Sequence, residues 1–276
     1  MEFNAQDVLL HWICERECVR INKEGDKPKP WTTDKILQNY KFCNVKREDD
    51  RVTKWVHENW LYPYAKSADV AFAMCVARHF NWPETLSAVG FPNIWDPEFV
   101  RTVLKNRRDK LGKKIYTGAY TVSTCGRAMD KIDYSIDIVL SPLWLALRAP
   151  ERGETLQSYW SQLCKYEGFA SFMAGQVVAD LKFIAPLESA SDWYSWAPLG
   201  PGSIRGLNRY FDRPLNYNVG QERGLEEMRE IQSMIFEHTG LKLALHNVQN
   251  CMCEFDKYCR LAYENGKVRS KYNGLS

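Results

Sequence analysis

The chain has 276 residues, of which 45% are hydrophobic, 26% are charged and 13% are aromatic. This composition is typical of a folded globular protein of one large or two small domains, and it excludes disordered, collagen-like and membrane-embedded chains. With 37 Lys and Arg against 34 Asp and Glu, the formal net charge is only +3, so only local clusters of basic residues can argue for a nucleic-acid partner.

The start of the chain and its cysteines indicate an intracellular protein. Residues 1–12 show no basic segment before an apolar run, so no signal peptide is expected, and no apolar run approaches the length of a membrane span. The nine cysteines lack paired CxxC spacing, and Cys251, Cys253 and Cys259 lack the partners of a closed zinc or iron–sulfur site. We therefore expect reduced, mostly buried thiols.

Most of the chain shows helical patterns with ordinary start signals, such as Thr33 or Asp34 as an N-cap. The ranges expected to be helical are 34–42, 40–55, 69–79, 97–111, 156–165, 169–182, 224–239 and 245–265. The best candidate strand is 113–123, where a short hairpin or loop fits equally well. We therefore predict a single, mainly α domain over 1–276, with an exposed polar loop at 22–30.

Residues 159–183 predict two helices joined by a tight hairpin. The turn from Gly168 to Ala174 resembles the helix–hairpin–helix motif of the HhH-GPD DNA glycosylases, with Ala170 in place of the usual second glycine. In that motif the first backbone N–H groups of the second helix point at a DNA phosphate. We therefore expect a DNA-glycosylase-like helical fold with Gly168 and Ala170 next to DNA, although other helical hairpins with a glycine turn look similar.

A carboxylate between two tryptophans follows the hairpin. Asp192 lies 24 positions beyond Gly168, about where the glycosylase superfamily has a catalytic aspartate, and Trp193 and Trp196 flank it. Aromatic faces beside a carboxylate suit a base taken out of the DNA stack. The alternative is that Asp192 caps a turn while the tryptophans fill the core.

A glycine-containing turn precedes two arginines. Pro201, Gly202 and Ser203 come just before Arg205 and Arg209, an order that can cradle an anion at a helix N-terminus or form a loop and a solvated helix face. No GxxxxGK[ST] sequence occurs in the chain. An ATP-binding kinase is therefore disfavoured.

The segment 40–55 carries a polar stripe. Asn44, Arg47, Glu48 and Arg51 recur at the spacing of one helix face, opposite an apolar face. Such a stripe can hold a phosphorylated substrate while the glutamate orients the arginines. By periodicity alone, a salt-bridged surface is the commoner explanation.

A second polar face is predicted in 246–258. Asn250, Glu254 and Lys257 share one face of a helix, while Asp256 points elsewhere, toward Arg260. The glutamate and lysine can accept a proton and contact a phosphate, or simply form a surface pair.

Basic residues are concentrated in 101–114. This segment holds seven Lys and Arg against one Asp, a local excess of six positive charges that includes Arg101, Lys105 and Arg108. A contact with the DNA backbone and a solvated helix face explain it equally well.

Three segments together resemble one family. They are 30–55, 197–209 and 246–258, and their F-x-N-V-x-R-E-x-D-R and C-E-F-D-K-Y stretches are the most specific parts. They resemble the alpha-glutamyl/putrescinyl thymine pyrophosphorylases, also described as the helical domain of 5-hydroxymethyluracil DNA kinase, whose members include amino acid:DNA transferases of phage thymidine hypermodification. The similarity runs from about residue 12 to residue 262.

The resemblance implies a transferase without a required cofactor. Its substrate would be double-stranded DNA in which a separate kinase has converted 5-hydroxymethyluracil to the pyrophosphate ester. An amino acid or a polyamine would replace the pyrophosphate, with Mg²⁺ as an optional aid to its departure. The implied location is the cytoplasm of a phage-infected bacterial host, with no membrane partner.

Roles for individual residues follow from this implied chemistry. A departing pyrophosphate needs cations, an incoming ammonium needs a carboxylate to take its proton, and a flipped base needs a stacking surface. The expected residues are Arg47, Arg51, Arg205, Lys257, Asn44 and Asp256 at the pyrophosphate or base, Asp192 and then Glu254 or Glu48 as the proton acceptor, and Trp193 or Trp196 under the base.

Two alternatives stay open at this point. The first is a monofunctional DNA glycosylase that uses Asp192, since no lysine of the bifunctional type lies at the hairpin. The second is a non-catalytic DNA-binding partner of the kinase, for which the basic segment 101–114 would matter and Asp192 would not.

Overall fold

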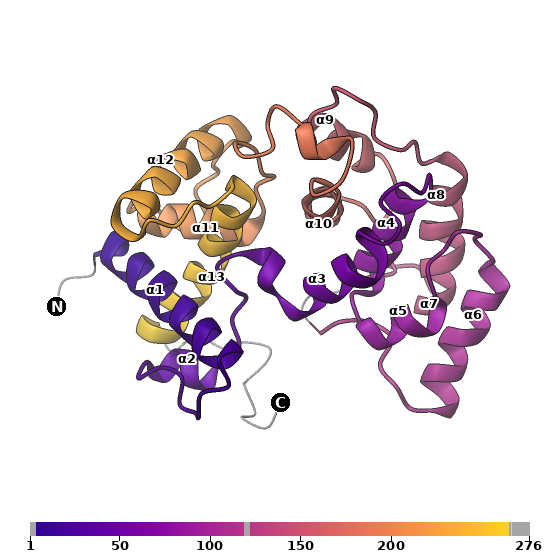
Figure 1. Cartoon of the computed structure of the whole chain (residues 1–276), viewed down its shortest axis with the longest axis horizontal. Coiled ribbons are helices and arrows are strands. Elements are labelled where there is room, and N and C mark those ends of the chain that lie inside the picture. The colour runs from indigo at the N-terminus through magenta and orange to yellow at the C-terminus, as the bar shows by residue number, and fades with distance from the viewer. Residues whose placement is uncertain (1–3, 119–121, 265, 267–276) are drawn as a thin grey trace. The chain divides into compact units, whose positions relative to one another are not determined.

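The computed structural model describes residues 4–118, 122–264 and 266 (Figure 1). Within these residues the regular secondary structure consists of helices, with no strand, which confirms the mainly α prediction. The candidate strand at 113–123 is wrong for its described residues, which are irregular; residues 119–121 lie outside the described part of the chain.

The contacts within the chain divide it into two compact units. Unit 1 combines Met1–Asp50 with Tyr194–Ser276, and unit 2 is Arg51–Trp193. The chain therefore leaves unit 1 after residue 50 and returns to it at residue 194. The single domain expected over 1–276 stays a prediction.

Unit 1 is built from segments at both ends of the chain. Its helices are α1 (Ala5–Glu24), α2 (Lys35–Asn39), the 3₁₀ turn η1 (Arg47–Asp49), α11 (Pro201–Tyr210), α12 (Gln221–Thr239) and α13 (Leu245–Tyr263). The Asp34 carboxylate accepts the N–H groups of Ile36 and Leu37, which confirms it as the N-cap of α2. Gly240 ends α12 in the left-handed conformation (φ +71°).

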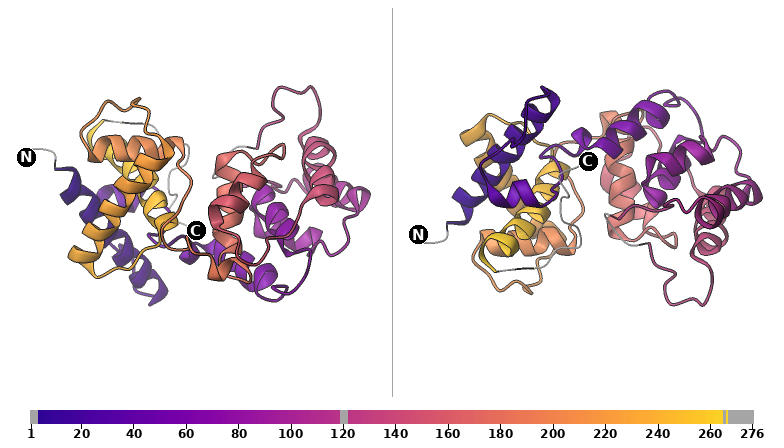
Figure 2. Two further views of the ribbon diagram at one scale, coloured as in Figure 1. Left: turned by 90° about the horizontal axis from the view of Figure 1, so that it is seen from above. Right: turned by 90° about the horizontal axis from the view of Figure 1, so that it is seen from below.

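Helix α13 is the centre of unit 1. It packs against α1, α11 and α12, and the views of Figure 2 show α1 (indigo) and α13 (yellow) side by side. Val248, Met252 and Phe255 of this helix are fully buried. Helix α11 approaches it most closely at Gly206, where a Cβ atom would lie only 2.1 Å from the Met252 carbonyl oxygen. A glycine is therefore required at this crossing.

Unit 2 is a second helical body. Its elements are α3 (Arg51–Val56), η2 (His57–Leu61), α4 (Val70–Phe80), α5 (Pro83–Val89), α6 (Pro97–Lys105), η3 (Asn106–Lys110), α7 (Lys131–Asp133), η4 (Tyr134–Leu140), α8 (Ser141–Ala146), α9 (Leu156–Leu163), α10 (Ser171–Leu181) and η5 (Leu187–Ser189). The π-helical turns η2, η3 and η4 continue the α-helices before them. Every residue of α4 is buried, so this helix forms the core of unit 2.

The predicted hairpin is formed by α9 and α10. The two helices pack together, and the predicted ranges 156–165 and 169–182 each run two residues too far into the turn. Gly168 lies between them with φ +83°, and a Cβ atom there would come within 2.8 Å of the Val139 side chain. The glycine thus allows both the left-handed turn and the close packing.

A buried charge network joins α10 to α4. The Asp180 carboxylate is fully buried and accepts hydrogen bonds from the Arg78 guanidinium, while His57 Nε2 lies 3.1 Å from its Oδ1. Arg78 also donates to Thr53 Oγ1 (3.1 Å) and Asn81 Oδ1 (3.0 Å). Because a buried charge without partners is costly, this network fixes how the two helices pack.

We predict that Gly206→Ala destabilises the protein by about 1–3 kcal/mol, because the added methyl group overpacks the α11–α13 crossing. Urea unfolding followed by circular dichroism measures the change. Gly220→Ala is the matched control, since a Cβ atom at Gly220 meets no described atom within 4 Å. Equal unfolding free energies for the two variants would contradict the role assigned to this crossing.

Candidate functional site

The three segments that carry the family resemblance meet on α13 in unit 1. Asn250 Nδ2 donates to the Asn44 carbonyl oxygen (3.1 Å), and the Cys43 N–H donates to Glu254 Oε2 (3.2 Å). Farther along the same face, Lys257 Nζ donates to the Lys41 carbonyl oxygen. The predicted face of Asn250, Glu254 and Lys257 is therefore present, and it holds the backbone of residues 41–44.

The same helix holds the next stretch of the first motif through Asn247, a residue that the sequence interpretation missed. Its Oδ1 accepts the Arg47 N–H (3.0 Å), and its Nδ2 donates to both oxygens of Glu48 (3.3 and 3.1 Å). Asn247 lies three residues before Asn250 on the same helix, so the spacing contained the signal. It brings Arg47 and Glu48 to the N-terminal half of α13.

The predicted helix face of the segment 40–55 is wrong. Asn44 lies in an irregular stretch, Arg47 and Glu48 belong to η1, and Arg51 begins α3 in unit 2, where it is exposed. A regular helix does not form here because distant side chains accept hydrogen bonds from the backbone of this stretch. Glu254 accepts the Cys43 N–H, and Asn247 accepts the Arg47 N–H. The first three polar residues of the stripe thus cluster in unit 1 without sharing a helix.

Asn44 links this stretch internally. Its Nδ2 donates to the Asp49 carbonyl oxygen (2.8 Å), its N–H donates to Asp50 Oδ1 (2.9 Å), and its Oδ1 accepts a hydrogen bond from Arg16 Nη2. Asn44 is buried. Burial raises the pKa of Asp50 to about 6, more than the hydrogen bond from Asn44 and the charges of Arg47 and Arg16 lower it. The contacts of Asn44 are therefore structural, and its substrate-binding role stays a prediction.

The polar residues held on helix α13 are called the cluster on α13: Asn44, Arg47, Glu48, Asn250, Glu254 and Lys257. Within this cluster, Glu254 and Lys257 form a charged pair. Lys257 Nζ lies 3.3 Å from Glu254 Oε2 and 4.4 Å from the centre of the Phe42 ring. Both side chains are mostly buried, at 11% and 20% exposure. A carboxylate and an ammonium group in this setting interact more strongly than at an open surface.

Three arginines surround Asp256 of the C-E-F-D-K-Y stretch. This aspartate is fully buried, and its oxygens accept hydrogen bonds from Arg205 Nε (3.1 Å), Arg209 Nε (2.8 Å) and Arg260 Nε (3.3 Å). A carboxylate surrounded in this way anchors the arginines of α11 on α13. Arg205 is the most exposed of the three, at 41%, and keeps part of its guanidinium accessible.

The residues predicted beside the flipped base have structural contacts. Asp192 of unit 2 accepts the N–H groups of Leu156 (2.8 Å) and Gln157 (3.0 Å) at the start of α9. Trp193 donates through Nε1 to the Lys182 carbonyl oxygen (2.6 Å), and the Lys182 ammonium lies 3.8 Å from the centre of its ring. Trp196 belongs to unit 1 and is 2% exposed. These contacts fit the capping and core alternative.

The basic segment 101–114 is partly neutralised in unit 2. Arg101 pairs with Asp133 and Asp137 (2.7 Å to Asp137), Lys105 pairs with Asp133 (2.9 Å), and Arg108 pairs with Asp130 (2.6 Å). The partners come from 130–137, a segment some 20 to 40 residues away in the sequence. These pairs favour the solvated helix face over a dedicated DNA contact.

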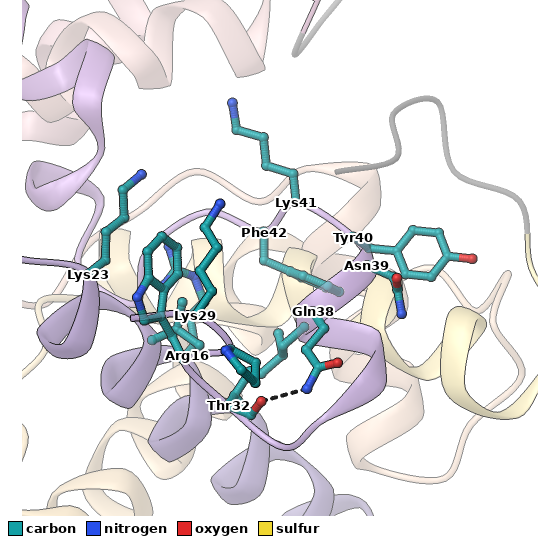
Figure 3. Close-up of a pocket in the computed structure, with 13 residues that line it drawn as sticks. Arg16, Lys23, Lys29, Thr32, Gln38, Asn39, Tyr40, Lys41 and Phe42 are labelled. Carbon is teal, nitrogen blue, oxygen red and sulfur yellow. Dashed lines mark hydrogen bonds between the residues drawn. The ribbon is translucent and has the colours of Figure 1, made fainter. Parts of the chain in front are cut away.

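Unit 1 also contains a pocket that the sequence did not indicate (Figure 3). Its volume is about 320 Å³, and its walls come from α1, α2 and the segments before and after α2. The residues that line it are Arg16, Val19, Lys23, Lys29, Pro30, Trp31, Thr32, Leu37, Gln38, Asn39, Tyr40, Lys41 and Phe42. The final four of these lead directly into Cys43 and Asn44, so the pocket adjoins the cluster on α13.

The sequence model of the protein family described as "5-hmdU DNA kinase, helical domain" matches residues 4–268 of this chain. The chain belongs to this family. It is also 25% identical over 270 residues to the 5-hmdU DNA kinase of Bacillus phage SP10, an alignment that covers 84% of this chain and 41% of the relative. The chain thus spans about two fifths of the length of that curated relative.

Two further findings concern the fold and membrane-spanning helices. No solved structure matches the chain, so the glycosylase-like fold stays a prediction. Among the described residues, no helix is long and apolar enough to cross a membrane. The descriptions of the family and of the phage relative both name a 5-hmdU DNA kinase.

We predict that the stability gained by Asp50→Asn increases with pH. The pKa of about 6 lies above the ordinary value of 3.8, so the folded state favours the protonated carboxyl, and that contribution is complete below pH 4 and is lost as the pH rises through 6. The neutral amide avoids this loss and keeps an acceptor for the Asn44 N–H. Relative to the wild type, the variant should gain about 2 kcal/mol between pH 4 and pH 7.

Urea unfolding of both proteins at several pH values measures this gain. Glu230→Gln, which removes an exposed carboxylate of α12, controls for the loss of one negative charge. A constant difference between Asp50→Asn and the wild type from pH 4 to pH 7 would refute the assignment.

Proposed function

We propose that the chain is a DNA-modifying transferase that acts on 5-hydroxymethyluracil activated as its pyrophosphate ester. The observation that carries this proposal is the convergence of the three family segments on α13. Through Asn247, Glu254 and Lys257, helix α13 holds the stretch 41–48, which contains Arg47 and Glu48. One helix thus holds both the cations proposed to stabilise the leaving pyrophosphate and the carboxylates proposed to accept a proton.

In the proposed reaction, the nitrogen of an amino acid or polyamine attacks the exocyclic methylene carbon of the base. The new C–N bond forms as the C–O bond to pyrophosphate breaks, and the pyrophosphate leaves with the bonding electron pair. Arg47, Lys257 and the exposed part of Arg205 stabilise the developing negative charge. Mg²⁺ on the pyrophosphate is compatible with this scheme, which does not require it.

Glu254 is the proposed proton acceptor for the incoming ammonium. Among the described residues its hydrogen bonds go through Oε2, to Cys43 and Lys257, so Oε1 is available for the amine. Glu48 is the second candidate. Asp192 is less suited, because both of its oxygens accept backbone N–H groups of α9, although the glycosylase resemblance still proposes it. Base flipping belongs to the same proposal, since the methylene lies within the duplex.

A second candidate is a non-catalytic DNA-binding partner of the kinase. The observation that favours it is the name of the phage relative, a kinase of which this chain matches 41%. The chain itself contains no GxxxxGK[ST] loop, so the phosphoryl-transfer part is expected in a separate segment or protein. In this alternative the cluster on α13 would only position DNA.

We predict that Glu254→Gln lowers the rate of amine transfer by about 100-fold or more, as expected when a proton acceptor is removed. The measurement is mass spectrometry of nucleosides after incubation with pyrophosphorylated DNA and a mixture of amino acids and polyamines. Glu264→Gln, at the exposed end of the same helix, should leave the rate within about 2-fold of the wild type.

The other outcomes of this experiment separate the alternatives. A loss of transfer in Asp192→Asn but not in Glu254→Gln would move the proton acceptor to Asp192. Abasic sites, detected as alkali-labile strand breaks, would favour a glycosylase. Unmodified DNA with the wild-type protein would contradict the transferase and leave the DNA-binding partner.

A further inference from the structure

The pocket of unit 1 combines positive charge with aromatic surface. Four of its lining residues are basic, namely Arg16, Lys23, Lys29 and Lys41, and three are aromatic, while the described residues that line it include no acidic side chain. In Figure 3 the ammonium groups of Lys23, Lys29 and Lys41 extend toward the same side of the pocket. This arrangement suits an anionic ligand with an aromatic part.

Two lysines of the pocket lie beside the Trp31 ring. Lys23 and Lys29 are exposed, and their ammonium groups lie 5.7 and 4.9 Å from the centre of the Trp31 ring. At an exposed site such a cation–π contact is worth only about 0.5–1 kcal/mol. A phosphate can therefore draw the Lys23 ammonium away from the ring, because charge-assisted hydrogen bonds are stronger.

Arg16 provides a deeper anchor. Its Nε donates to the Cys43 carbonyl oxygen (3.0 Å) and its Nη2 to Asn44 Oδ1, whereas its Nη1 is buried without a hydrogen-bond partner among the described residues. A buried donor without an acceptor is costly. An anionic or carbonyl oxygen in the pocket would satisfy this donor, and Arg16 would connect the ligand to Asn44.

The walls that carry the aromatic side chains are fixed. Trp31 donates through Nε1 to the Lys27 carbonyl oxygen (2.7 Å), and Asn22 of α1 donates to the Trp31 carbonyl oxygen (3.0 Å). Phe42 is 6% exposed and packs between Trp12 and Tyr258. The loop predicted as exposed and polar is therefore tied to α1 and presents Trp31 as a partly exposed wall above an apolar floor.

We propose that this pocket binds one nucleotide, with the base against Trp31 and Phe42 and the phosphate on Lys23, Lys29 and Lys41. The volume of about 320 Å³ lies at the lower end of small-ligand pockets and suits one nucleotide better than a dinucleotide cofactor. The nucleotide comes either from an unpaired position of a DNA strand or from free solution. The inference rests on the proposed function only in its choice of thymidine probes.

Binding is tested by fluorescence anisotropy with a fluorescein-labelled single-stranded oligothymidylate, with dTMP, duplex DNA and inorganic pyrophosphate as separate competitors. Trp31→Leu should weaken binding about 10-fold, as expected for the loss of one base–aromatic stack. The double substitution Lys23→Ala with Lys29→Ala should weaken it about 10-fold or more and reduce the dependence on salt concentration. Circular dichroism shows whether each variant is folded.

Lys242→Ala is the matched control. Lys242 also belongs to unit 1 and lies over an aromatic ring, with its ammonium 5.9 Å from the centre of Phe236, but it does not line the pocket. Its substitution removes one positive charge and should change the affinity by less than about 2-fold. A wild-type protein that binds the oligothymidylate but transfers no amine to pyrophosphorylated DNA contradicts the proposed function alone.

The competitors identify the source of the nucleotide. Displacement by dTMP at concentrations similar to its own dissociation constant supports a free nucleotide, and displacement only by DNA supports a strand position. Equal displacement by pyrophosphate, with no effect of Trp31→Leu, would show a simple anion site and overturn the proposal. Wild-type affinity in the folded lysine and tryptophan variants would overturn it as well.

Discussion

Unit 1 depends on side chains of α13 that bind the backbone of a distant segment. Asn247, Asn250 and Glu254 together contact residues 43–48, about 200 positions earlier in the chain. The other face of α13 is apolar and buried against α1, α11 and α12. One helix therefore builds the core and positions the polar cluster, and a disturbance of its packing is transmitted to both.

The polar face of α13 could be predicted from the sequence, but the conformation of the segment 40–55 that it contacts could not, for a physical reason. The face of Asn250, Glu254 and Lys257 follows from 3.6-residue periodicity, a local property that survives folding. The stripe from Asn44 to Arg51 has the same periodicity, but there the N–H groups bind side chains in place of carbonyl oxygens four residues earlier. Helix formation is cooperative, so a few such distant hydrogen bonds suffice to prevent it.

The sequence also could not show which basic residues have carboxylate partners in the folded chain. The excess of basic residues in 101–114 is real, yet its Arg101, Lys105 and Arg108 have carboxylate partners from 130–137. Arg205 likewise faces the buried Asp256. The sequence places Lys23 and Lys29 in the predicted polar loop 22–30 and Lys41 in a predicted helix, because spacing cannot show that the three lysines line one pocket. Pairing across the fold, and not composition, decides that Arg101, Lys105, Arg108 and Arg205 already have carboxylate partners.

This distinction bears on how a DNA-modifying protein uses its positive charge. A cation already paired with a carboxylate loses part of that interaction when it binds phosphate, so it adds little net affinity, whereas an exposed lysine over an aromatic ring gives up little. Arg16 extends the same logic inward, since burial lowers its pKa more than the nearby carboxylates raise it. An anion in the pocket would accept a hydrogen bond from the same guanidinium that donates to Asn44. One side chain, Arg16, therefore lines the pocket and also holds Cys43 and Asn44 beside the cluster on α13.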